Sequence, residues 1–93
     1  MPDTNHARME IEERRTRIDE IDRQLVALLN ERAGHSLAIR KLKPLLDMET
    51  YDPAREREIY EKVTSYSDGT LYDQGLREIY ETLLKVMKEN PAA

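Results

Sequence analysis

The feature that most constrains the fold is a long stretch with almost no helix-breaking residue. Between Ile11 and Lys43 there is no proline and one glycine, Gly34, while apolar residues recur at helical spacing. A helix over 11–43 would be about 50 Å long. A compact domain of 93 residues has a diameter of only about 32 Å. The helix should therefore project from its own domain, and its apolar stripe predicts a two-fold dimer. That stripe comprises Ile18, Ile21, Leu25, Leu28, Leu29 and Ile39.

Two shorter helices are expected after a connector over residues 44–51. Asp52-Pro53 is a typical helix start, with aspartate as N-cap and proline at the first position. The second helix should stop at residues 67–70, and a third should run from about Tyr72 to Glu89 before Pro91. The apolar faces would be Ile59, Val63 and Tyr66 on the second helix, and Leu76, Ile79, Tyr80, Leu83, Val86 and Met87 on the third.

No window alternates like a strand, so the fold class is predicted to be all-α, with three helices per chain. Residues 1–9 are expected to form a disordered tail, 10–90 the helical domain and 91–93 a short C-terminal tail.

Composition excludes several function classes. The net charge of −4 opposes non-specific nucleic-acid binding. The chain has no cysteine, so disulfides and cysteine-ligated metals are excluded, and the two histidines lack metal-ligand spacing. No stretch approaches the ~20 apolar residues of a membrane span, and the polar N-terminus lacks a signal-peptide core. We therefore expect a cytoplasmic protein that binds neither nucleic acid nor membrane.

Basic residues interrupt the apolar stripe of the long helix. On a helical wheel Arg32 and Lys43 fall inside the stripe, and Arg15 lies at its edge. Such side chains can lie over apolar surface with their charged ends in water. Alternatively, because the same face offers no carboxylate, the missing counter-ion is an anionic ligand. Both interpretations remain open from these residues alone.

The first turn of the second helix repeats this pattern. Asp52, Arg55 and Glu56 lie near its apolar face, whereas Arg57 and Glu58 point away. Asp52 could be only an N-cap, and Arg55 and Glu56 an ordinary solvated surface. The functional interpretation is a polar cluster that faces the same cavity as Arg32 and Lys43.

Several cations around one cavity suit a small dicarboxylate, because guanidinium binds carboxylate through two parallel hydrogen bonds. No serine has a nearby base, so the implied chemistry depends on positioning and electrostatics. Arg15 lies about 25 Å from Arg32 along the helix. An antiparallel dimer would bring Arg15 of one chain to the Arg32 region of the other.

These residues resemble the all-helical class of chorismate mutases. The pattern is Arg15-x-x-Ile18-Asp19-x-Ile21-Asp22-x-x-Leu25-x-x-Leu28-Leu29-x-x-Arg32, then Lys43, then Asp52-x-x-Arg55-Glu56, and the resemblance extends to about Met87. It implies an intertwined, domain-swapped homodimer. It also implies a cofactor-free rearrangement of chorismate to prephenate in aromatic amino-acid biosynthesis.

The resemblance also implies roles for these residues. Arg15 would enter the neighbouring chain's site, and Arg32 and Arg55 would bind the substrate carboxylates. Lys43 would contact a carboxylate and the ether oxygen, while Asp52 and Glu56 would face the substrate hydroxyl. We expect the catalytic group to be Lys43, Arg32 and Glu56, and the remaining substrate contacts to include Ile39, Leu84, Met87 and Glu89.

The sequence departs from the family in two places. The helix 3 glutamine that usually donates to the ether oxygen corresponds to Pro91, which has no donor. Asn90 or a protonated Glu89 would have to replace it. Pro44 directly follows Lys43 and disfavours helical geometry there, so Lys43 is predicted to lie at a helix end or kink.

Two other functions compete with this one. An isochorismate pyruvate lyase has the same fold but usually lacks the acidic pair, so Asp52 and Glu56 favour the mutase. A non-catalytic helical dimerisation or regulatory module is favoured by the missing glutamine and opposed by the retained cations.

Overall fold

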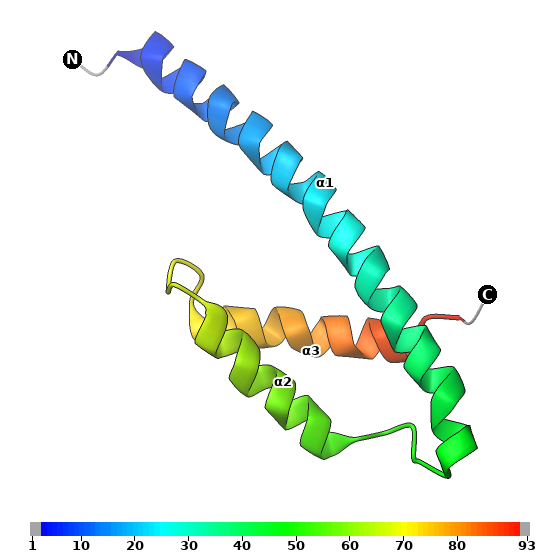
Figure 1. The fold of residues 1–93 in the computed structure, drawn as a ribbon. Coiled ribbons are helices and arrows are strands. Elements are labelled where there is room, and N and C mark those ends of the chain that lie inside the picture. Colours follow the sequence, from blue (N-terminus) through cyan, green and yellow to red (C-terminus); the bar gives the residue numbers. More distant parts are fainter. Residues whose placement is uncertain (1–2, 92–93) are drawn as a thin grey trace. The chain divides into compact units, whose positions relative to one another are not determined.

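The computed structural model describes residues 3–91, which form helices and connecting turns (Figure 1). Helix α1 spans Thr4–Leu42, the short 3-10 helix η1 Lys43–Leu46, α2 Pro53–Tyr66 and α3 Asp73–Glu89. No strand occurs among the described residues, and the all-α prediction is confirmed. The parts of the expected tails at residues 1–2 and 92–93 lie outside the described residues. The chain divides after Gly34 into two compact units.

Helix α1 begins at Thr4, earlier than the expected start near Ile11. The Asp3 side chain accepts a hydrogen bond from the His6 amide at 3.1 Å, and its backbone carbonyl accepts one from Ala7 at 3.0 Å. An aspartate in this position satisfies an amide that the helix itself cannot pair. Residues 4–9 are therefore helical rather than part of a tail, because Asp3 acts as a cap that the sequence analysis overlooked.

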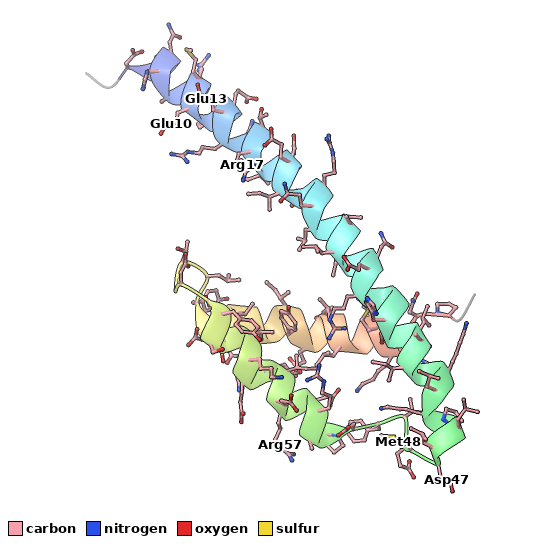
Figure 2. All side chains as sticks on the ribbon, in the orientation of Figure 1. Glu10, Glu13, Arg17, Asp47, Met48 and Arg57 are labelled. Atoms are coloured by element: carbon pink, nitrogen blue, oxygen red, sulfur yellow. The ribbon has the colours of Figure 1, made fainter. Side chains whose placement is uncertain are left out.

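The described part of the first unit, residues 3–34, contains only α1, and its apolar stripe is exposed. Ile18, Leu25 and Leu28 are 53%, 50% and 60% exposed. The polar side chains of this unit, including Glu10, Glu13 and Arg17, radiate from a single helix (Figure 2). Its ion pairs join residues one turn apart on this exposed surface, such as Arg17 and Glu20 at 2.9 Å, and contribute little stability. This unit buries almost none of its apolar surface by itself.

In the second unit α2 and α3 form a helical hairpin and contact each other (Figure 1). Its buried apolar residues are Leu84 and Met87 on α3, each 7% exposed. The half-buried apolar residues of the same two helices are Ile59, Val63, Leu76, Tyr80 and Leu83.

The predicted stripe of α3 is broader than the face that packs. Ile79 and Val86 are 52% and 54% exposed, and Tyr66 of α2 is 76% exposed. Ile79 and Val86 lie seven residues apart and therefore share one face of the helix, a different one from Leu84 and Met87. Helical periodicity identified apolar positions here without separating the packed face from the exposed one.

The boundaries after α1 follow the predicted local rules. The α-helix ends at Leu42, and Lys43 begins η1, where Pro44 stands at the N-terminal end. Asp47 ends η1 with a φ of 58°, in the left-handed region. Asp52 caps α2 by accepting a hydrogen bond from the Arg55 amide at 3.0 Å, and Pro53 follows it. The predicted start of the second helix is confirmed, and Lys43, predicted to lie at a helix end or kink, follows the last residue of the α-helix.

Arg40 ties the last turns of α1 to the end of α3. Its Nη1 donates to the Asn90 carbonyl at 2.7 Å, and its Nη2 donates to the Met87 carbonyl. These carbonyls belong to the C-terminal turn of α3, where the helix itself supplies no donor. A guanidinium with two parallel donors suits this bridge, and its positive charge complements the helix dipole.

We expect Arg40→Met to lower the free energy of unfolding by about 1–3 kcal/mol, because it leaves these half-buried carbonyls without donors. Urea unfolding at one fixed protein concentration measures the change. The exposed neighbour Lys41 provides the control, since Lys41→Met should change stability by no more than about 0.5 kcal/mol. Equal midpoints for the two variants would show that the Arg40 bridge adds no stability.

Candidate active site

The predicted site residues belong to both units of the chain. Arg15 and Arg32 lie on α1 in the first unit, where Arg32 is half-buried and Arg15 is exposed. Arg15 pairs with Glu12 at 3.1 Å within its own helix. The second unit contains the other predicted residues: Ile39, Lys43, Asp52, Arg55, Glu56, Leu84, Met87 and Glu89.

Lys43 is held at the junction between α1 and η1. Its Nζ donates a hydrogen bond to the Thr50 carbonyl at 3.0 Å, across the loop that leads to α2. The side chain is half-buried. An ammonium group has three donors, so this contact orients the lysine and leaves further donors for a ligand.

Asp52 has the structural role that its position predicts. One carboxylate oxygen, Oδ1, accepts the Arg55 amide, and the residue is half-buried at the start of α2. A carboxylate has more acceptor sites than one amide occupies. Capping the helix is therefore compatible with a second contact to a ligand.

Arg55 differs from the expectation that it faces a cavity together with Glu56. Its guanidinium pairs with Glu58 at 3.0 Å, and the residue is exposed. Lys62 contacts the same carboxylate at 2.7 Å, and this hydrogen bond, with smaller help from Arg55, lowers the pKa of Glu58. The long Arg55 side chain thus reaches a partner one turn along the helix surface.

Arg57 projects from the side of α2 that faces away from α3, as predicted (Figure 2).

Glu56 is paired with a residue that the sequence analysis missed. Its Oε1 lies 2.6 Å from Nζ of Lys88, in the last turn of α3. The hydrogen bond to Glu56 is the largest cause of the raised pKa of Lys88. Stabilisation from this shift is fully present below the ordinary lysine pKa of 10.5 and is lost only as the pH rises through the raised value. Lys88 therefore remains charged at neutral pH.

A sequence signal for Lys88 exists. It stands four residues after Leu84 and one after Met87, the buried apolar residues of α3, so it borders the packed face of the helix. A cation at such a border can pair with a carboxylate of the helix that packs against this face.

The remaining predicted residues occupy different environments. Leu84 and Met87 are buried in the second unit, whereas Ile39 is 54% exposed. Glu89 is the exposed last residue of α3, followed by Asn90 and Pro91. The Asn90 carbonyl is occupied by Arg40.

Several charged side chains of the second unit are held in place by the contacts described above. Half-buried Lys43, Asp52 and Glu56 lie at or near the start of α2, and Lys88 joins them through Glu56. Among residues 3–91, no group of three or more histidines, cysteines or carboxylates is placed to hold a metal ion. No helix in the same part of the chain is long and apolar enough to span a membrane. This arrangement can bind and orient a polar ligand.

The chain resembles known proteins along most of its length. A family model described as chorismate mutase type II matches residues 14–90. The bifunctional chorismate mutase/prephenate dehydratase of Aquifex aeolicus (strain VF5) is 34% identical over 79 residues, which is 81% of this chain and 22% of that protein. The protein of the same name from Neisseria gonorrhoeae (strain ATCC 700825 / FA 1090) is 33% identical over 70 residues, 75% of this chain and 19% of its own. The chain thus spans about a fifth of the length of these relatives.

A solved structure described as chorismate mutase (form II) from Thermus thermophilus is also similar, with a TM-score of 0.83 and 26% identity. The similarity covers 90% of this chain and 99% of that one, so it extends over nearly the whole of both. Together with the family match over residues 14–90, this shows that the chain belongs to the chorismate mutase type II family.

Proposed function

We propose that the protein is a cytoplasmic isomerase that converts chorismate to prephenate in aromatic amino-acid biosynthesis. The observation that carries this proposal is the family match over residues 14–90, which includes every charged position of the predicted site. Those positions are Arg15, Arg32, Lys43, Asp52, Arg55, Glu56 and Glu89.

The proposed reaction needs no nucleophile and no cofactor. A Claisen rearrangement breaks one C–O bond and forms one C–C bond within a single molecule. Catalysis then consists of holding the reactive chair-like conformer and stabilising the negative charge that develops on the ether oxygen. Fixed cations and hydrogen-bond acceptors supply both.

Each polar residue has a role in this mechanism. Arg32 and Arg55 bind the substrate carboxylates, and Arg55 must leave Glu58 to do so. Lys43 directs its remaining donors at the ether oxygen, an interaction that strengthens in the transition state. Asp52 and Glu56 face the substrate hydroxyl, and Glu56 accepts its hydrogen bond.

The proposed enzyme is an intertwined homodimer. The exposed apolar stripe of α1 in the first unit supports it, because a second copy of this helix would cover the stripe. Arg15 and Arg32 are about 25 Å apart along α1, so one small substrate cannot touch both from a single chain. In the dimer, Arg15 of one protomer completes the site that contains Arg32 of the other.

The direct test is an assay with purified protein. Loss of chorismate absorbance with prephenate as the product is the expected result. Release of pyruvate from isochorismate, without turnover of chorismate, would identify a lyase of the same fold. Binding of chorismate without conversion would identify a non-catalytic module.

We expect Lys43→Met to lower kcat by about 100-fold or more while changing KM much less. The reason is that the cation acts mainly on charge that develops in the transition state. Steady-state kinetics on chorismate measures both constants, with Lys41→Met as a control that keeps wild-type values. A large rise in KM at unchanged kcat would assign Lys43 to ground-state binding alone.

The dimer predicts complementation between two inactive variants. Arg15→Ala and Arg32→Ala should each abolish most turnover, because each leaves a substrate carboxylate unpaired. After subunit exchange of an equal mixture, half of the dimers are mixed, and each mixed dimer has one site with both arginines. About a quarter of wild-type activity should return. No recovery despite demonstrated exchange would disprove the shared site.

The oligomeric state itself can be measured without substrate. Static light scattering at micromolar concentration should give about twice the chain mass of 10.9 kDa. A folded, compact monomer under these conditions would contradict the dimer.

A further inference from the structure

The Glu56–Lys88 contact differs from every other ion pair among residues 3–91. The others join residues three or four apart on one helix, whereas this one joins the first turn of α2 to the last turn of α3. The Glu56 side chain is 23% exposed, and the Lys88 side chain is 47% exposed. Lys88 is therefore the ion-pair partner of a largely buried carboxylate.

The ammonium group of Lys88 is held from a second side as well. It lies 4.9 Å from the centre of the Tyr51 ring, in the loop immediately before α2. The face of an aromatic ring attracts a cation, and this attraction fixes its position without using one of its donors. Lys88 thus connects α3 both to α2 and to the loop that precedes α2.

The other oxygen of Glu56, Oε2, makes no hydrogen bond within the described part of the chain. A carboxylate with one oxygen on a lysine is fixed in orientation and remains an acceptor at the other. If the cation were absent, a poorly solvated carboxylate would turn toward water. This change removes the acceptor from its place.

We propose that Lys88 is a positioning residue of the active site, which holds the Glu56 carboxylate oriented so that its free oxygen accepts a hydrogen bond from the substrate hydroxyl. This assignment rests on the proposed function. It gives α3 a polar role in the site although Pro91 has no side-chain donor. The effect of Lys88 on the reaction passes through Glu56, so Lys88 need not touch the substrate.

The test is a double-mutant cycle on kcat/KM for chorismate, with Lys88→Met, Glu56→Gln and the combination. Lys88→Met should lower kcat/KM about tenfold, which corresponds to about 1.4 kcal/mol. In the Glu56→Gln background the same substitution should cost less than about twofold, because the carboxylate that it positions is gone. Lys88→Arg should restore most of the lost activity, since guanidinium keeps the charge and the donor.

Lys85→Met is the matched control. Lys85 is exposed on the same helix and makes no ion pair with the residues that the structure describes, so the same change of charge should leave kcat/KM unaltered. Circular dichroism and urea midpoints for all variants separate an altered site from an unfolded chain. The cycle is interpreted only at temperatures where every variant is folded.

Three results would overturn the assignment. A folded Lys88→Met with wild-type kcat/KM would show that the pair has no role in turnover. An equal loss in both backgrounds would show that Lys88 acts independently of Glu56. Inactive wild-type protein would remove the proposed function and this assignment with it, whereas the first two results leave the proposed function intact.

Discussion

The rest of the structure depends on one constraint: an unbroken helix carries an apolar stripe that its own part of the chain leaves uncovered. Helix α1 extends for 39 residues, and Ile18, Leu25 and Leu28 each expose half of their surface or more. Apolar area that stays in water contributes nothing to stability. Arg15 and Arg32 lie on this same helix. The proposed dimer would therefore cover the stripe and complete the proposed site through the same contact.

In the second unit, the end of α3 is where separate elements are joined. Arg40 binds the last carbonyls of α3, and Lys88 binds Glu56 one turn inside the start of α2. A helix end that frays would move both contacts, so each of these basic residues stabilises the geometry that the other requires. Both contacts lie at the C-terminal end of α3, before Pro91.

Local rules predicted most of the fold, whereas the cross-helix contacts needed three-dimensional information. Asp52-Pro53 and Lys43-Pro44 identify helix boundaries by capping and steric effects that involve neighbours in sequence, and the structure confirms both. The Asp3 cap follows the same rule and was overlooked. Periodicity shows which residues share a face but not which face meets another helix, so it could not show that Ile79 is exposed or that Glu56 is the partner of Lys88. Arg55 shows that a position on the helical wheel does not determine the partner of a long side chain. It lies near the apolar face, yet its guanidinium pairs with Glu58 on the surface.

The reaction that we propose makes solvent exclusion a functional requirement as well as a structural one. Fixed charges stabilise a transition state more strongly when water is excluded from them, because the local dielectric falls. Lys43, Asp52 and Glu56 are half-buried in the chain as described, and its buried apolar side chains are Leu84 and Met87. Such a small core supplies neither much stability nor a dry site. A second protomer over the apolar stripe would add both stability and exclusion of water. We therefore expect that a change which weakens dimerisation also weakens the electrostatic preorganisation of the site.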